Sequence, residues 1–143
     1  MLDVQHIDHI GIRISDRAVS TAFYEKLGFA TVTDAGFDEG HPIIMRHPSG
    51  VTLNLLGPST AGEGTNILMD VSDKHPGITH FALHVRSLDD TKAFLAREGI
   101  AITGSFSFGP LSAVFIRDPD RTVIELDARV EAADKSGSYS DHP

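Results

Sequence analysis

The chain has 143 residues, of which 41% are hydrophobic and 22% are charged, and its formal net charge is −8. These values are typical of one soluble globular domain or two joined half-units, and an acidic chain without a basic run argues against nucleic acid as a partner. The absence of cysteine excludes disulfides, thiolate metal sites and a cysteine nucleophile. The N-terminus does not resemble a signal peptide, and no apolar run approaches the roughly 20 residues of a membrane span, so we expect a cytoplasmic protein with no membrane partner.

The first half of the chain is predicted to contain a strand, a helix and three further strands. Period-two apolar residues predict a strand over 6–15. Apolar residues at three- and four-residue spacing then predict a helix, and they are Ala18, Val19, Ala22, Phe23 and Leu27. Ser15 or Asp16 can cap this helix, and Gly28 ends it. Further strands are predicted over 29–32, 43–46 and 51–55, so residues 1–56 form a βαβββ module.

The second half repeats this order after a segment rich in turn-forming residues. We interpret 57–77 as a linker in which 67–69 is a short edge strand. The second module, 78–128, is predicted to have a strand at 78–85, a helix at 90–98, a strand at 100–103, a loop at 104–109 and strands at 113–117 and 122–127. Residues 129–143 are polar and are predicted to be a short helix or a frayed tail.

A shift of 71 residues aligns the two modules without a gap. Ten of the 50 positions in 7–56 are then identical, against about three expected for random pairing. The coinciding positions include the strand histidines, His9 and His80, and the glycines that end the helices, Gly28 and Gly99. The chain is therefore interpreted as a duplicated module.

The repeat also places a polar residue on the last strand of each module, because Asn54 pairs with Glu125. His9 and His80 lie on the faces opposite the strand aliphatics, and Glu125 is flanked by two apolar residues that point the other way. Two histidines and one carboxylate suit Fe(II), Zn(II), Ni(II) or Mn(II) with open positions for a substrate. The alternative is that the histidines are satisfied by backbone carbonyls and that Glu125 forms a salt bridge.

Four motifs resemble those of the vicinal oxygen chelate superfamily, which includes glyoxalases, epimerases, bleomycin resistance proteins and extradiol dioxygenases. They are His9-Ile-Gly-Ile-Arg-Ile-Ser-Asp16, Phe23-Tyr-Glu-Lys-Leu-Gly-Phe29, Gly77-Ile-Thr-His80, and Asp118-Pro-Asp120 followed by Ile124-Glu-Leu126. The resemblance implies an α+β fold in which two βαβββ modules in tandem form a half-open barrel around a metal site. It places the metal ligands at His9, His80 and Glu125 and implies a divalent cation as cofactor.

The chain departs from the family pattern at Asn54, where relatives often carry Glu or Gln. Asparagine is a weak ligand, so it is expected to contact metal-bound water or the substrate, and we assign catalytic roles to Glu125 and Asn54. The resemblance implies a lyase or isomerase of glyoxalase or epimerase type acting on a small molecule. An Fe(II) extradiol dioxygenase and a non-enzymatic drug-binding resistance protein are the alternatives.

Other polar residues are predicted to contact the substrate. Arg13 and His84 are equivalent in the repeat and lie four residues after a predicted ligand, Thr52 lies two residues before Asn54, and His47 lies in a turn. Arg13 and His84 can equally emerge into solvent at the strand ends. A homodimer is the default expectation for the assembly.

Overall fold

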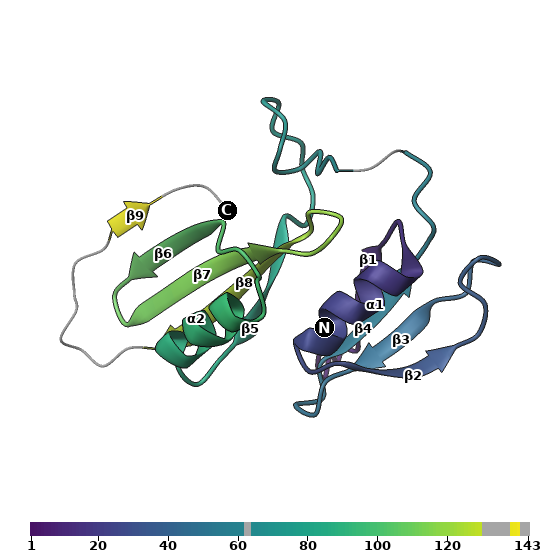
Figure 1. Cartoon of the computed structure of the whole chain (residues 1–143), viewed down its shortest axis with the longest axis horizontal. Coiled ribbons are helices and arrows are strands. Elements are labelled where there is room, and N and C mark those ends of the chain that lie inside the picture. The colour runs from purple at the N-terminus through teal and green to yellow at the C-terminus, as the bar shows by residue number, and fades with distance from the viewer. Residues whose placement is uncertain (62–63, 130–137, 141–143) are drawn as a thin grey trace. The chain divides into compact units, whose positions relative to one another are not determined.

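Each half of the chain folds around one sheet and one helix (Figure 1). The computed structural model describes residues 1–61, 64–129 and 138–140. These residues belong to two units, Met1–Glu63 and Gly64–Pro143. Among the described residues, neither helix has the length and apolar character needed to cross a bilayer.

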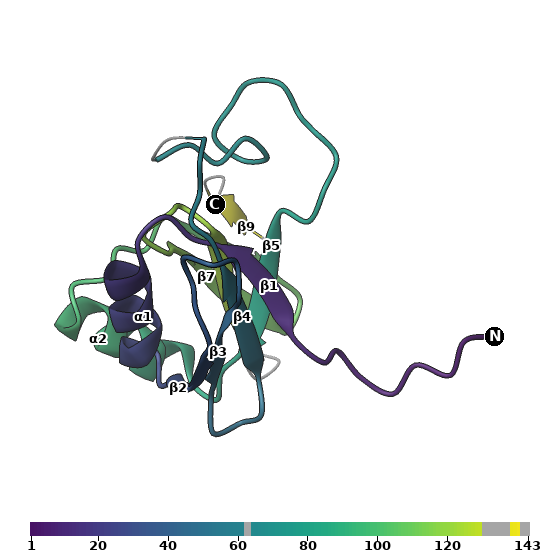
Figure 2. The ribbon, with the colours of Figure 1, turned by 90° about the vertical axis from the view of Figure 1, so that its right-hand side faces the viewer.

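The first unit has a four-stranded sheet. Its elements are β1 (Ile10–Arg13), α1 (Arg17–Lys26), β2 (Ala30–Asp34), β3 (Ile43–Arg46) and β4 (Thr52–Leu56). The strands lie in the order β1-β4-β3-β2, with β1 parallel to β4 and the other pairs antiparallel. The segment before β1 is exposed and runs outward from the sheet (Figure 2).

The second unit repeats this topology and adds a strand. Its elements are β5 (His80–His84), α2 (Leu88–Arg97), β6 (Gly104–Phe108), β7 (Leu111–Arg117), β8 (Val123–Arg129) and β9 (Ser138–Ser140). The strands lie in the order β5-β8-β7-β6-β9, with β5 parallel to β8.

The strand registers preserve the 71-residue repeat. Gly11 pairs with Asn54 in the first sheet, and their equivalents Ala82 and Glu125 pair in the second. Likewise Ile44 lies opposite Asn54, as Phe115 lies opposite Glu125. The predicted tandem of βαβββ modules is thus confirmed, and the register of β1–β4 and β3–β4 recurs residue by residue in β5–β8 and β7–β8.

Both helices begin and end as the sequence indicates. The Asp16 side chain accepts a hydrogen bond from the Val19 N–H at 2.9 Å, and Ser87 Oγ accepts one from the Asp90 N–H at 3.1 Å. These bonds satisfy amide groups that the first helical turn leaves without partners. Gly28 and Gly99 follow the helices with φ of 99° and 69°, a region that L side chains rarely adopt.

The buried face of α1 differs from the predicted face. Tyr24 and Ser20 are fully buried, whereas Val19 remains 52% exposed. Leu95, the repeat equivalent of Tyr24, is the fully buried residue of α2. A stripe of apolar spacing did not reveal this face because a serine belongs to it and an exposed valine does not.

Three predicted segments are corrected by the structure. Residues 67–69 form a turn rather than an edge strand. Residues 100–103 are not a strand, and the strand is β6, which occupies most of the predicted 104–109 loop. Within the predicted C-terminal tail, Ser138–Ser140 forms β9 against β6, and 130–137 and 141–143 lie outside the described residues.

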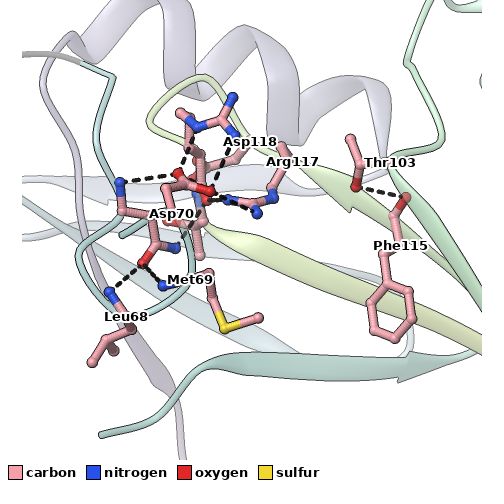
Figure 3. Close-up of polar contacts among 10 residues, drawn as sticks. Leu68, Met69, Asp70, Thr103, Phe115, Arg117 and Asp118 are labelled. Atoms are coloured by element: carbon pink, nitrogen blue, oxygen red, sulfur yellow. Dashed lines mark hydrogen bonds and ion pairs between the residues drawn. The ribbon is translucent and has the colours of Figure 1, made fainter. Parts of the chain in front are cut away.

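An ionic cluster anchors the segment after Gly64 to the β7–β8 turn (Figure 3). Asp70 accepts hydrogen bonds from Arg117 Nη2 at 3.0 Å and from Arg121 Nε at 2.6 Å. Asn66 donates its side-chain N–H to the Arg121 carbonyl at 3.1 Å. The hydrogen bond from Arg121 lowers the pKa of Asp70 below its ordinary value, with further help from the Asn66 N–H and Arg117, although burial opposes the shift. The linker thus has a defined structure at this point.

Candidate functional site

Two strands of the second unit bring His80 and Glu125 into contact. His80 begins β5 and Glu125 lies on its parallel neighbour β8, so both side chains project from one face of the sheet. His80 Nε2 and Glu125 Oε2 are 3.1 Å apart, and the side chains are 38% and 13% exposed. The pair is therefore reachable from solvent, although the carboxylate is largely shielded.

The aromatic ring of Phe115 forms an apolar side of this pair. Phe115 lies on β7 directly opposite Glu125, is 7% exposed and meets the His80 ring edge-to-face at a centroid distance of 6.2 Å. Such packing restricts the rotation of the imidazole.

The other nitrogen of His80 is occupied by the preceding residue. Thr79 Oγ1 lies 2.9 Å from His80 Nδ1. If Nδ1 carries the proton and donates it to the hydroxyl, Nε2 has a free lone pair beside Glu125. If the hydroxyl donates instead, the Nε2–H donates to Glu125. The first arrangement can hold a cation between nitrogen and carboxylate, and the second is a direct hydrogen bond from the imidazole to the carboxylate.

His9, in the first unit, is held in the same manner. It precedes β1, is 45% exposed, and its Nδ1 lies 2.7 Å from Asp8 Oδ2. The hydrogen bond and charge of His9 lower the pKa of the Asp8 carboxyl. Asp8 and Thr79 are equivalents in the 71-residue repeat, so each predicted ligand histidine has its Nδ1 bound by the residue before it. The sequence analysis missed both partners, although the repeat offset pairs them.

Asn54 occupies the place in the first sheet that Glu125 occupies in the second. It is half-buried between its register partners Gly11 and Ile44, on the sheet face that also carries Arg13. Its amide offers one acceptor and two donor hydrogens in place of a negative charge. This position can therefore hydrogen-bond to an oxygen of a bound molecule.

Of the remaining predicted substrate contacts, Thr52 is hydrogen-bonded within the protein, whereas Arg13 and His84 are exposed. Thr52 Oγ1 donates to the Gly50 carbonyl at 3.2 Å and accepts from Arg46 Nε at 3.3 Å. Arg13 is exposed at the end of β1. His84 is exposed on β5 and contacts Asp127, which the sequence analysis did not identify.

His47 is held in a turn at the end of β3. Its Nδ1 accepts the Ser49 N–H at 3.0 Å, and its ring packs on Phe29 at a centroid distance of 5.3 Å. These contacts give His47 a structural role whether or not a substrate meets its Nε2.

The structure thus brings His80 and Glu125 together within the second unit, while His9 and Asn54 belong to the first. In 1–61, 64–129 and 138–140, no three histidine, aspartate or glutamate side chains are grouped closely enough to hold a metal ion. The predicted set of three ligands therefore stays a prediction.

Comparison with known proteins gives a family and a set of shared folds. The model of the Glyoxalase/Bleomycin resistance protein/Dioxygenase superfamily matches residues 6–126. No curated protein matches the chain.

Solved structures resemble the fold over most of the chain. A glyoxalase family protein from Enterococcus faecalis is 22% identical with a TM-score of 0.72, covering 88% of this chain and 99% of its own. A glyoxalase/dioxygenase from Nostoc punctiforme is 22% identical with a TM-score of 0.71, covering 90% and 94%. The fosfomycin resistance protein FosX from Listeria monocytogenes is 15% identical with a TM-score of 0.65, covering 90% and 96%. At these identities the likeness concerns the fold alone.

Proposed function

Because the chain belongs to the glyoxalase/bleomycin resistance protein/dioxygenase superfamily, we propose that it is a metal-dependent lyase or isomerase that binds a small substrate through vicinal oxygens. The observation that carries this proposal is the contact between His80 Nε2 and Glu125 Oε2. The superfamily includes enzymes with this chemistry, and the pair supplies the two kinds of donor that a catalytic divalent ion uses.

The separation of the two donors fits a shared ion. The 3.1 Å between His80 Nε2 and Glu125 Oε2 would allow both atoms to bind one ion, and it also suits an ordinary hydrogen bond. A proton on Nε2 and a cation therefore compete for the same place, so binding of the ion is expected to release the proton.

His9 is the proposed third ligand. Its Nδ1 is bound by Asp8, which leaves Nε2 as the ligand atom, and His80 presents Nε2 with Nδ1 bound by Thr79. A nitrogen–nitrogen–carboxylate set suits Zn(II), Ni(II), Mn(II) or Fe(II), and when bound such an ion supplies Lewis-acid polarisation of a carbonyl oxygen.

The chain's own residues then bind and orient the substrate. Phe115 packs against the His80 ring beside Glu125, and the Asn54 amide donates a hydrogen bond to a substrate oxygen. Arg13, which is exposed at the end of β1, offers a cation to an anionic substituent. An Fe(II) dioxygenase would use the same ligands, and a drug-binding protein would need none of them as ligands.

Metal titration of the purified, chelator-treated chain tests the proposal. We expect about one equivalent of Ni(II) or Zn(II) to bind in calorimetry, and His80→Ala or Glu125→Ala to weaken binding at least tenfold. His6→Ala is the matched control, since His6 is an exposed histidine with no assigned role. Less than about a tenth of an equivalent would favour a binding protein without metal.

Turnover separates the two enzymatic alternatives. Metal-dependent conversion of a hemithioacetal, without oxygen uptake, supports the lyase or isomerase. Oxygen uptake on catechols after anaerobic loading with Fe(II) would instead assign the chain to the dioxygenases.

A further inference from the structure

A second histidine–carboxylate pair lies on the same two strands as His80 and Glu125. His84 and Asp127 are direct register partners at the other end of the β5–β8 pairing. His84 Nδ1 and Asp127 Oδ1 are 2.6 Å apart, and the side chains are 63% and 19% exposed. A separation this short is typical of a hydrogen bond with an ionised partner.

The contact places Nδ1 of His84, rather than Nε2, against the carboxyl group of Asp127. A carboxylate accepts hydrogen bonds, so this geometry favours the tautomer with its proton on Nδ1. Nε2, on a side chain that is mostly exposed, then keeps its lone pair. A histidine oriented in this way by a carboxylate is suited to take up a proton.

The pair faces the same side as the proposed metal ligands. Alternate residues of a strand share a face, so His80 and His84 project together from β5, as Glu125 and Asp127 do from β8. Asp127 follows Glu125 by about 6.7 Å along the strand, a spacing that a molecule of a few carbon atoms and the two side chains can bridge.

The fold does not require this pair. The repeat equivalents in the first sheet are Arg13 and Leu56, which are partners in the same register. The backbone is preserved there too, because the Ile14 N–H donates to the Leu56 carbonyl at 2.7 Å, just as the Val85 N–H donates to that of Asp127 at 2.7 Å. The polar pair thus distinguishes the second sheet from the first. The same backbone pairing forms in the first sheet with Leu56 in place of the carboxylate, so the fold does not need Asp127.

We propose that His84 is the general base of the reaction and that Asp127 is its positioning residue. This inference rests on the proposed function and narrows the substrate to molecules in which a carbon that carries both a hydrogen and a hydroxyl lies next to a carbonyl. His84 Nε2 takes the proton from this carbon, the electron pair of the broken C–H bond forms a C=C bond, and the carbonyl π electrons move onto the carbonyl oxygen to give an enediolate. The same nitrogen returns the proton to the former carbonyl carbon while the hydroxyl proton passes to the former carbonyl oxygen, so the carbonyl and hydroxyl groups exchange places. The step is redox-neutral, and it supplies the base that Asn54 cannot provide.

The orientation of His84 can be tested without substrate or metal. Long-range nitrogen–proton NMR correlation of the whole chain is expected to show His84 with its proton on Nδ1, and Asp127→Asn is expected to abolish that preference. A His84 ring that is mainly protonated on Nε2, or is indifferent to Asp127→Asn, would overturn the proposal.

Its role in proton transfer is tested by hydrogen exchange into a carbon acid. The metal-loaded protein in deuterated water is expected to exchange the C–H proton of the methylglyoxal–glutathione hemithioacetal or of dihydroxyacetone. His84→Ala is expected to slow exchange at least 100-fold through kcat rather than KM, with unchanged metal content and partial rescue by added imidazole. Asp127→Asn is expected to slow the exchange at least tenfold, and His6→Ala is expected to leave the exchange rate unchanged.

The outcomes separate this inference from the function on which it rests. Exchange that persists in His84→Ala would show that His84 and Asp127 are not the base and its positioning residue, and it would remain compatible with the isomerase function. Absence of exchange in the wild-type protein with both probes would overturn the isomerase function, and the role of His84 as base would end with it.

Discussion

Asp8 and Thr79 hold the two predicted ligand histidines through equivalent contacts, but only Asp8 is charged. A carboxylate bound to Nδ1 makes Nε2 a stronger ligand and fixes the tautomer, and removal of such a partner typically weakens metal binding about 10–100-fold. We expect Asp8→Ala to weaken Ni(II) binding in calorimetry by that factor, and Thr79→Val to have a smaller effect. Asp3→Ala is the control, because Asp3 is exposed and contacts Gln5. Equal affinities in all four proteins would show that His9 is not a ligand.

The residues of the site were predictable to the extent that they follow the repeat. His80 and Glu125 were identified from alternation and the 71-residue offset, and the structure places them in contact. Asp127 was missed because its repeat equivalent is Leu56, so the offset gave no signal. The register of the parallel pair would have found it, since His84 and Asp127 have the same sequence separation as the paired residues His80 and Val123.

At the scale of an element, Gly28 and Gly99 end equivalent helices but have different surroundings. A Cβ at Gly28 would lie 3.0 Å from the His47 ring, whereas nothing lies within 4 Å of one at Gly99. Both alanine variants should lose about 1–2 kcal/mol of folding stability, because alanine adopts a positive φ less readily than glycine. We expect Gly28→Ala to lower the free energy of unfolding in urea by more than Gly99→Ala, because His47 must also move. Equal decreases would show that His47 can move without an energetic penalty.

The Asp70 cluster is expected to make the stability of the second unit depend on acid. The pKa of Asp70 is lower in the folded chain than in the unfolded chain, mainly because Arg121 donates to it. Its stabilising contribution is therefore complete above about pH 4 and is lost as the pH falls below that value.

Asp70→Asn tests this expectation. The variant should lose about 1.5–3 kcal/mol at pH 7, since the 17%-exposed carboxylate accepts several charged hydrogen bonds. Its free energy of unfolding in urea should fall less than that of the wild type between about pH 4 and about pH 2. The matched control is Asp73→Asn, a change in the exposed part of the same segment. Parallel pH profiles for wild type and Asp70→Asn would contradict the assignment.

The elements themselves were predicted best where alternation and capping agreed. The helices were found from their caps and glycines, whereas β6 was placed too early. Its equivalent, β2, has an irregularity between Thr31 and Thr33, and β6 pairs only in the register that β2 adopts after it. A bulge of this kind changes which residues pair without changing the apolar pattern, so periodicity could not locate the start of β6.

At the scale of the whole molecule, duplication supplies two similar sheets that carry different residues at equivalent positions. The shared register preserves a polar position on the last strand of each module, Asn54 in one and Glu125 in the other. The second sheet also carries His84 and Asp127 where the first has Arg13 and Leu56. The central strands of both sheets keep the same pairing, while the polar residues on their faces have diverged.

The proposed ligands predict where a bound ion should slow hydrogen exchange: in β5 and β8 through His80 and Glu125, and in β1 if His9 is the third ligand. Ni(II) at about 100 times its dissociation constant should stabilise the folded chain by about 2.7 kcal/mol. Hydrogen exchange followed by mass spectrometry is expected to show slower exchange in both β1 and β5. In His9→Ala the protection should be confined to β5 and β8, because His80 and Glu125 still bind weakly there, while His6→Ala should behave as the wild type. Protection of β1 that survives His9→Ala would mean that the first unit contributes some other ligand, and Asn54 would then be the residue to replace next.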